Sequence, residues 1–259
     1  MKHYGSVPLL LKQLALPTMQ SLWEDLAKKA LDHGWHPARY LKELCEYELA
    51  DRESRRLARH LKESKLPSAK SLEVFNFSAV PSLNKTQILG LGDGGMWIDQ
   101  GRNLLMFGPS GVGKTHLAAG IGEKLIEAGY RVFFTRTTEL VQKLQAAKSD
   151  LTLPAALDKL DKYHCLILDD FGYVKRNGAE TSLLFELISE RYERRSIIIT
   201  CNQPFQHWDQ IFEDKQMAIA AIDRLIHHGV VLEFSAESYR KREAESRLRK
   251  EGKKKSKKT

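Results

Sequence analysis

The octapeptide GPSGVGKT matches the pattern G-x-x-x-x-G-K-[ST], whose residue types suit the binding of phosphate groups. Its glycines let the backbone turn tightly and approach phosphate oxygens without a Cβ in the way, so that successive amides form an anion nest at a helix N-terminus. Lys114 is expected to reach the β- and γ-phosphates, and Thr115 to offer a hydroxyl to Mg²⁺. The sequence therefore predicts a site for ATP with Mg²⁺. The predicted binding set is Gly108, Pro109, Ser110, Gly111, Val112, Gly113, Lys114, Thr115 and His116.

Two adjacent carboxylates follow a second apolar run. Asp169 and Asp170 come directly after residues 166–168, Leu-Ile-Leu. A phosphate loop needs a carboxylate at the tip of a neighbouring buried strand to hold the water shell of Mg²⁺, and Asp169 is placed for that role. Asp170 is placed to polarise the attacking water. An ordinary turn also explains two aspartates at a strand end, but downstream of a phosphate loop we favour the metal site.

Asn202 and Arg224 are candidates for contacts with the γ-phosphate, and each has a structural alternative. Asn202 follows the apolar run 196–200, and its amide would orient the attacking water; the alternative is a turn-forming asparagine. Arg224 lies near the end of an apolar helical pattern and would stabilise transition-state charge at the ATP of a neighbouring subunit. A fixed salt bridge, with Asp223 or Glu213, is equally compatible with the sequence.

The cysteines and the paired histidines give no pattern typical of metal binding. Cys45, Cys165 and Cys201 form no C-x-x-C pair, which is the usage of a reducing compartment without disulfides or a zinc site. His227 and His228 are adjacent, so on a helix they would point in different directions and make a poor pair of ligands. We interpret them as surface residues near a helix end.

From residue 100 onwards, apolar runs alternate with helical patterns and would position these groups. Apolar runs without polar alternation predict strands buried on both faces, as in a parallel sheet between layers of helices. The predicted strands span residues 103–107, 131–135, 165–168, 196–200 and 230–234. The predicted helices between them span residues 115–128, 138–147, 154–161, 180–193 and 217–228. The sequence therefore predicts an α/β domain whose candidate residues follow strand ends.

Residues 7–65 predict helices, because their apolar side chains recur at three- and four-residue spacing. Thr18 is expected to cap a helix that starts at Met19. The stretch 51–62 is highly charged with both signs. It predicts either a solvated helix with charge pairs at i,i+4 or a basic face for DNA.

A linker is predicted at residues 66–80, packed back onto the following domain through Phe75 and Phe77, with a short helix after it at 83–91. The predicted domains are a helical DNA- or partner-binding domain at 1–66, an ATPase domain at 67–245 and a basic tail at 246–259. The tail is rich in lysine, which is typical either of a solvated segment or of a contact with nucleic acid.

The overall balance of the chain is basic, with a net charge of +8 over 259 residues. Such a balance favours polyanionic partners, nucleic acid first. No stretch approaches the ~18 to 20 apolar residues of a membrane span, and no cleavage pattern of a signal peptide follows the N-terminus. We therefore expect a cytoplasmic protein with no membrane partner.

Several segments together resemble the IstB-like ATP-binding proteins, the ATPase helpers encoded beside the transposase in one group of bacterial insertion sequences. These segments are GPSGVGKTHLA, LILDDFG, TCNQPF, AAIDRLIHHG and the closing SYR. The N-terminal part, with EYELADRESRRLARHLKESKLP and FNF, resembles the family as well, so that only the lysine tail is left out. The helicase loader DnaC and the initiator DnaA are more distant relatives in the AAA+ class.

The resemblance implies an AAA+ P-loop NTPase fold with a parallel five-stranded sheet in the order 5-1-4-3-2 and little or no helical lid. It implies roles for Lys114 and Thr115 (Walker A), Asp169 and Asp170 (Walker B), Asn202 (sensor I) and Arg224 (arginine finger), with Arg240 as a candidate second sensor. Many AAA+ proteins have Glu where this chain has Asp170. Because the aspartate side chain is one methylene shorter, we expect slow hydrolysis, which suits a switch better than a motor.

The resemblance also implies ATP-dependent assembly into an oligomer on double-stranded DNA and regulation of a partner transposase. A helicase loader in DNA replication is the alternative. A small-molecule kinase is a third class, since phosphate loops serve kinases too. Kinases usually carry a substrate-binding lid with arginines, whereas residues 138–162 contain lysines but no arginine.

Overall fold

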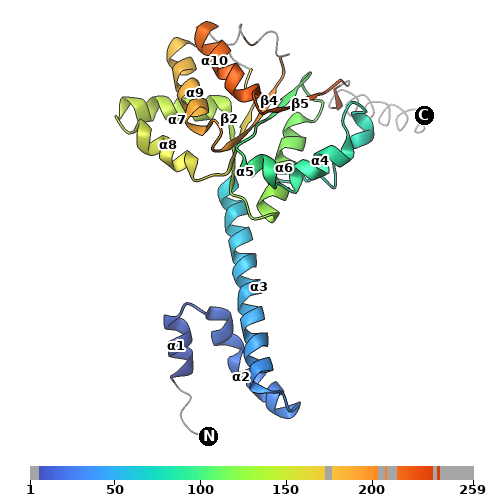
Figure 1. Cartoon of the computed structure of the whole chain (residues 1–259), viewed down its shortest axis with the longest axis vertical. Helices are drawn as coiled ribbons and strands as arrows, with labels where there is room; N and C mark the ends of the chain where they lie inside the picture. The colour runs from blue at the N-terminus through green and yellow to red at the C-terminus, as the bar shows by residue number, and fades with distance from the viewer. Residues whose placement is uncertain (1–5, 173–176, 204–207, 209–214, 236–237, 240–259) are drawn as a thin grey trace, which may run out of the picture. The chain divides into compact units, whose positions relative to one another are not determined.

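The computed structural model describes residues 6–172, 177–203, 208, 215–235 and 238–239. The chain divides into two compact units, Met1–Arg59 and His60–Thr259. The predicted helical character of the N-terminal part is present in α1 (Val7–Gln13), α2 (Pro17–Asp32) and α3 (Pro37–Ser64), the last of which continues into the second unit (Figure 1). Met19, Leu26 and Leu44 are buried at the core of the first unit.

Thr18 does not cap a helix, so this detail of the prediction is wrong. Helix α2 begins two residues before the predicted start, at Pro17, because proline suits the first helical position and has no amide N–H to satisfy there. The Thr18 hydroxyl instead donates to Asp51 at 2.7 Å, and its backbone N–H donates to Glu48 at 2.9 Å. Thr18 therefore ties the start of α2 to the side of α3.

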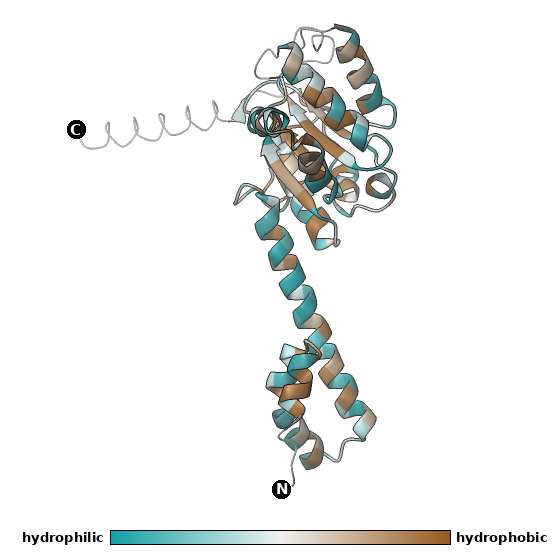
Figure 2. Ribbon diagram, turned by 90° about the vertical axis from the view of Figure 1, so that its left-hand side faces the viewer, coloured by the Kyte–Doolittle hydropathy of each residue, from teal (hydrophilic) through white to brown (hydrophobic). Residues whose placement is uncertain are grey.

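The charged part of α3 carries the ion pairs expected of a mixed-sign helix. Arg55 lies 2.8 Å from Asp51 four residues before it and 3.3 Å from Glu48, while Arg56 lies 2.6 Å from Glu53. Figure 2 shows the hydrophilic colouring along this helix. These arginines therefore already have carboxylate partners within the helix.

The second unit contains the predicted parallel sheet. Its strands are β1 (Leu104–Phe107), β2 (Val132–Arg136), β3 (Cys165–Asp169), β4 (Ser196–Cys201) and β5 (Val230–Glu233). The spatial order is β2-β3-β4-β1-β5, which confirms the order implied by the family resemblance. Every residue of the three central strands is buried, as their unbroken apolar runs predict. Ile199 of β4 pairs with Leu105 on one side and Leu168 on the other, so the carboxyl ends of β1, β3 and β4 meet at one edge.

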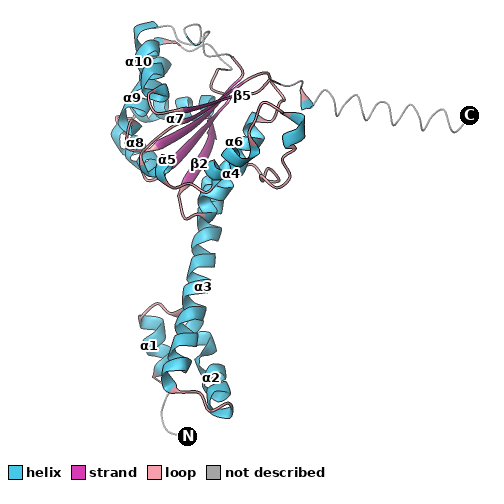
Figure 3. Ribbon diagram, turned by 45° about the vertical axis from the view of Figure 1, so that its right-hand side comes forward, coloured by secondary structure: helices cyan, strands magenta, loops and turns pink. Residues whose placement is uncertain are grey.

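Helices cover both faces of the sheet (Figure 3). Their bounds are α4 (Lys85–Gly92), α5 (Met96–Asp99), α6 (Lys114–Glu127), α7 (Thr137–Ser149), α8 (Leu153–Asp161), α9 (Gly178–Arg191) and α10 (Lys215–Ile226), with a 3₁₀ turn at Phe77–Ala79. One hydrophobic core joins α7 to α10 to one face of the sheet, and α6 packs on the other. None of the helices in the described ranges combines the length and apolar character needed to cross a membrane.

Helix α6 fits between the sheet and the linker because it has glycine on both sides. A Cβ at Gly122 would lie 2.7 Å from the side chain of Ile167 on β3, and one at Gly120 would lie 2.9 Å from the backbone nitrogen of Leu72 in the linker. Because β-carbons do not approach other atoms so closely, larger residues at these positions would push α6 away from its neighbours. The close fit places the first turn of α6 against the carboxyl edge of the sheet.

The end of α10 and the presence of α5 are among the differences from the sequence-based expectation. Helix α10 ends at Ile226, two residues before the predicted end, and Gly229 N–H closes the turn on the Ile226 carbonyl at 2.7 Å. His227 and His228 therefore lie in a turn and not on a helix. The short helix α5 falls where the sequence predicts no element, because four residues are too few to show a helical period.

Candidate functional site

The phosphate loop connects the end of β1 to the start of α6. Gly108, Gly111 and Gly113 all have positive φ angles, of 144°, 83° and 107°, which only glycine adopts readily. A Cβ at Gly108 would lie 2.6 Å from the carbonyl oxygen of Phe234, just beyond β5. The loop is therefore wound tightly against the neighbouring strand, with its amides at the N-terminus of α6, as the motif predicts.

Lys114 folds back over the loop. Its Nζ donates to the carbonyl oxygens of Gly108 at 2.6 Å and Pro109 at 2.8 Å, and the residue is only 8% exposed. The ammonium is thus held by backbone dipoles at the loop itself. A bound phosphate would offer the same group charged acceptors, which form stronger hydrogen bonds than neutral carbonyls do.

Thr115 and Asp169 meet, although they are far apart in the sequence. The Thr115 hydroxyl donates to Oδ1 of Asp169 at 2.8 Å, and Asp169 is 4% exposed. Thr200 of β4 donates to the same Oδ1 atom at 2.6 Å. A hydroxyl and a carboxylate side by side are hard oxygen ligands of the kind that Mg²⁺ prefers. The arrangement therefore fits the predicted metal position.

Thr200 is the residue that the sequence reasoning missed. Besides its bond to Asp169, its Oγ1 accepts the backbone N–H of Asp170 at 3.1 Å, and its carbonyl accepts the N–H of Phe171 at 2.9 Å. Asp170 itself is exposed and has a φ of 54°, a left-handed conformation that aspartate tolerates better than most residues. Thr200 thus fixes both the buried carboxylate and the turn that carries the exposed one.

Asn202 and Arg224 are placed differently with respect to this edge. Asn202 is exposed and comes directly after β4, beside the end of β3. Arg224 lies in the last turn of α10, donates to the Ala220 carbonyl at 3.0 Å and has its guanidinium 5.0 Å from the centre of the Phe185 ring. No ion pair with Asp223 occurs among the described residues, whereas Glu213 and Arg240 lie outside them.

His116 is turned toward the linker. Its Nε2 lies 2.9 Å from the carbonyl oxygen of Ser71, and its ring packs edge-on against Phe75. Phe75 in turn packs against Phe77, and a Cβ at Gly113 would lie 3.0 Å from the Phe75 ring. The predicted packing of the linker through its aromatic residues is confirmed, and it reaches the phosphate loop itself.

The segment after β5 also returns to the loop. The backbone N–H of Tyr239 donates to the Gly111 carbonyl at 3.0 Å. Apart from the resemblance of the SYR segment to a known family, no feature of the sequence indicates this contact. The loop is therefore held from two sides, by the linker before the sheet and by the chain after it.

Two cysteines of the sheet are buried thiols: Cys165 begins β3, at the opposite end from Asp169, and Cys201 lies at the carboxyl edge. Desolvation raises the pKa of Cys165 to about 12 and also raises the pKa of Cys201, which ends β4. A thiol whose pKa lies above its usual range stays protonated and is a poor nucleophile. The chemistry of this edge therefore rests on its lysine, hydroxyls and carboxylates.

Comparisons with known proteins agree with this geometry. The family model described as IstB-like ATP binding protein matches residues 9–247. An insertion sequence ATP-binding protein of Sinorhizobium fredii is 54% identical over 236 residues, which are 91% of this chain and 79% of that protein.

Two solved structures share the fold at low identity. The DnaC helicase loader aligns with a TM-score of 0.52 at 22% identity, over 58% of this chain and 87% of that one. The replication initiator DnaA, bound to AMPPCP and single-stranded DNA, aligns with a TM-score of 0.54 at 20% identity, over 67% of this chain and 52% of that one. The second unit therefore has the AAA+ fold of these proteins.

Proposed function

The chain belongs to the family of IstB-like ATP-binding proteins, and from this premise we propose that it binds and hydrolyses ATP with Mg²⁺, assembles with ATP on double-stranded DNA and regulates a partner transposase in DNA transposition. The observation that carries the proposal is the contact between Thr115 and Asp169 behind the loop that holds Lys114. A turn without a ligand has no need to bring a hydroxyl to a buried carboxylate at the tip of β3, which β4 separates from β1.

The loop residues have distinct tasks in binding ATP. The amides at the start of α6 receive the phosphate oxygens, and Lys114 transfers its hydrogen bonds from the Gly108 and Pro109 carbonyls to the β- and γ-phosphates. Thr115 and Asp169 would hold Mg²⁺, directly and through its water shell. When bound, the ion would neutralise charge on the phosphate oxygens.

For hydrolysis, Asp170 and Asn202 are the proposed groups that orient the attacking water. Both are exposed at the carboxyl edge, next to the buried pair. The short side chain of Asp170 favours slow turnover, so that the bound nucleotide sets the assembly state. Arg224 is the proposed finger for a neighbouring subunit. Its guanidinium lies over Phe185 on the outer helix layer, and α10 would have to present it across a subunit interface.

Two observations support the proposal that DNA and a transposase are partners: the net charge of the chain and the names of its homologues. The net charge of +8 favours a polyanion, and relatives over most of the chain are named as proteins of insertion sequences. The ion pairs of Arg55 and Arg56 on α3 leave these arginines less free for phosphate contacts. A helicase loader rests on likeness of fold alone, at 22% identity.

The test measures assembly size by analytical ultracentrifugation, with and without duplex DNA, in ATP, ADP and no nucleotide. We expect a large complex only when DNA, ATP and Mg²⁺ are together. Lys114→Ala should abolish it, because the loop loses its only side-chain cation, whereas the exposed Lys162→Ala serves as the matched control. Unchanged ATP binding by Lys114→Ala in calorimetry would contradict the role of the loop, and assembly without nucleotide would contradict the switch.

A further inference from the structure

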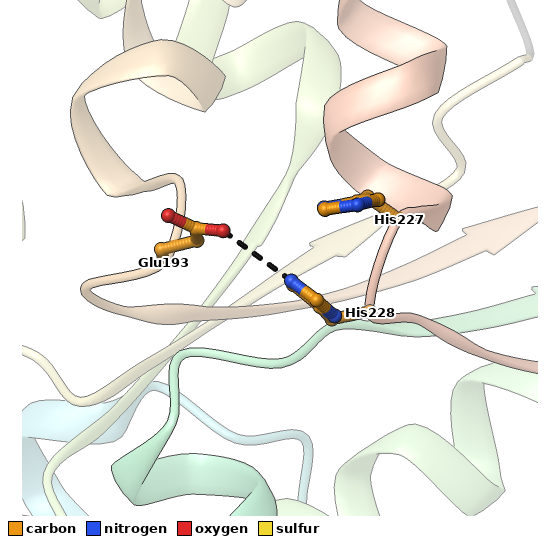
Figure 4. Close-up of side chains that lie close together, drawn as sticks. All are labelled: Glu193, His227 and His228. Carbon is orange, nitrogen blue, oxygen red and sulfur yellow. Dashed lines mark hydrogen bonds and ion pairs between the residues drawn. The ribbon is translucent and has the colours of Figure 1, made fainter.

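The side of the sheet at which the parallel strands begin, opposite the phosphate loop, is here called the amino edge. It carries a cluster of two imidazoles and a carboxylate. Glu193 precedes β4, and His227 and His228 precede β5 (Figure 4). One ligand atom from each of the three residues lies within 4.8 Å of the other two. The sequence-based objection to a histidine pair assumed a helix at these positions. Since α10 ends at Ile226, both rings belong to a turn, where they lie with their centres 4.0 Å apart.

The spacing within the cluster suits a tetrahedral ion. Nε2 of His228 lies 3.3 Å from Oε1 of Glu193. Zinc takes nitrogen and oxygen ligands at about 2.0 to 2.1 Å, and a tetrahedron of that size has ligand atoms about 3.3 to 3.4 Å apart. One edge of such a tetrahedron is therefore already formed. Rotation of the His227 side chain, which would exchange its contact with the Tyr192 hydroxyl for the ion, would complete the third position.

The backbone around Glu193 is held in place. Arg191 is 1% exposed, and its guanidinium donates to the backbone carbonyls of Leu160, Tyr163, His164 and Ser196. Glu193 has a φ of 56°, and a Cβ at Gly101 would lie 2.7 Å from its carbonyl carbon. The turn that presents the carboxylate is therefore anchored on one side and tightly packed on the other.

The histidine turn is fixed as well. The Tyr192 hydroxyl lies 2.8 Å from Nδ1 of His227, and the Gly229 N–H closes the turn on the carbonyl of Ile226. The cluster also lies at the C-terminal ends of α9 and α10, where the partial negative charge of a helix attracts cations. The helix ends and the donor atoms therefore favour the same kind of ligand.

The donor set selects the class of ion. Two imidazole nitrogens and one carboxylate oxygen suit zinc, whereas Mg²⁺ prefers oxygen ligands and keeps its water. The side chains of Glu193 and His228 are 53% and 46% exposed, so a water molecule has room for the fourth position. Three protein ligands and one water is an arrangement that zinc commonly adopts.

We propose that Glu193, His227 and His228 bind one Zn²⁺ ion per chain, with water as the fourth ligand. The ion would join the turn after α9 to the turn after α10. Because α10 also carries Arg224, the bound ion would hold the end of that helix against α9. This site is separate from the phosphate loop, and the proposal does not depend on ATP hydrolysis.

The test uses the full chain without an affinity tag, stripped with a chelator and kept in excess Mg²⁺. Calorimetric titration with Zn²⁺ should give one ion per chain. Co²⁺ should give the intense visible absorption of four-coordinate cobalt. Glu193→Gln, His227→Gln and His228→Gln should each lower the zinc affinity at least ~10-fold, which is the loss that even a second-shell substitution can cause. His33→Gln, an exposed histidine of the first unit, is the control and should bind as the unmodified chain does.

Three results would overturn the proposal. The first is no zinc binding by a chain whose folding is confirmed by circular dichroism. The second is equal affinity in Glu193→Gln and the unmodified chain, since an adventitious pair of histidines needs no carboxylate. The third is an equal loss in the His33→Gln control, which would place the ion elsewhere. Each of these results leaves ATP-dependent assembly untouched, so the two proposals fail separately.

Discussion

The carboxyl and amino edges of the sheet hold their polar groups in different ways. At the carboxyl edge, Lys114 and Asp169 are 8% and 4% exposed, and short hydrogen bonds join them to the loop and to neighbouring strand ends. At the amino edge, Glu193 and His228 are about half exposed and lie in turns after helices. One edge is a packed site, and the other is a surface cluster on a rigid support.

The difference follows from the direction of the helices. Helix α6 starts at the carboxyl edge, so its free amides and positive end face any ligand there. Helices α9 and α10 end at the amino edge, where free carbonyls and a negative end prevail. A parallel sheet with helical connections therefore offers anions one edge and cations the other.

The largest expected effect comes from Thr200→Val, which tests how tightly the carboxyl edge is built. Valine keeps the shape but removes the donor to Asp169 and the acceptor for the Asp170 N–H. A hydrogen bond contributes about 0.5 to 1.5 kcal/mol, so the loss of these two costs about 1 to 3 kcal/mol, although Thr115 still donates to Asp169. We expect that loss in urea unfolding without nucleotide, and a fall of about 10-fold in ATP turnover, because the metal-holding carboxylate loses its orientation.

The matched control for that substitution is Thr138→Val, at a half-buried position in the first turn of α7. It should change neither measurement appreciably. If Thr200→Val lowers stability but leaves turnover at the unmodified value, Thr200 supports the fold alone. The contrast between a packed and a surface edge would then lose its functional meaning.

Gly101→Ala tests the support of the amino edge and should have a moderate effect. Gly101 has a φ of 63°, and an added Cβ would lie 2.7 Å from the backbone nitrogen of Arg194 and the carbonyl carbon of Glu193. We expect a loss of about 1 to 3 kcal/mol in the free energy of unfolding, from the left-handed conformation and the clash together. The zinc affinity of Gly101→Ala should also be lower than that of the unmodified chain, because the turn at Glu193 must move to make room for the Cβ.

Gly34→Ala separates those two costs. Gly34 has a similar φ of 60° but no atom within 4 Å of an added Cβ, so it carries the conformational cost without the clash. An equal loss in the two variants would show that the turn at Glu193 is not tightly held. The amino edge would then lack the rigid support that the zinc proposal requires.

The sequence predicts the carboxyl edge well because its chemistry is local. The loop from Gly108 to Thr115 is contiguous, and Asp169 follows an unbroken apolar run that fixes its place at a strand end. Unbroken apolar runs also predict a parallel sheet, whereas the strand order came from the family resemblance alone. The sequence does not indicate a role for Thr200 at the site, because a β-branched residue inside a strand is ordinarily a packing residue.

The amino edge could not be predicted, because it is assembled from turns. A helix boundary misplaced by two residues puts His227 and His228 on a helix, and it turns a converging pair into a diverging one. Nothing in the sequence relates Glu193 to either histidine, since their proximity depends on the pairing of α9 with α10. The start of α2 is a second boundary that the sequence did not predict correctly. The helix begins at Pro17, two residues before the predicted start at Met19, so Thr18 does not cap it.

The smallest expected effect is a pH dependence at the amino edge, carried by His164 just before β3. Burial lowers the pKa of His164, and the nearby Arg195 and Arg131 lower it further. The backbone N–H of Arg131 lies 2.9 Å from Nδ1 of His164 and donates to it when Nδ1 carries no proton. The folded state therefore favours the neutral ring. This contribution to stability is complete above the unfolded pKa of about 6.5 and is lost as the pH falls below it.

We therefore expect the free energy of unfolding to fall between pH 7.5 and pH 5.5, by less in His164→Asn than in the unmodified chain. Asparagine keeps an acceptor for the Arg131 N–H but does not titrate. Urea unfolding in a chelator measures the slope, so that no bound metal ion contributes to it. Identical slopes for His164→Asn and the unmodified chain would mean that His164 has the same pKa in the folded and the unfolded state. Burial and the nearby arginines would then not lower its pKa.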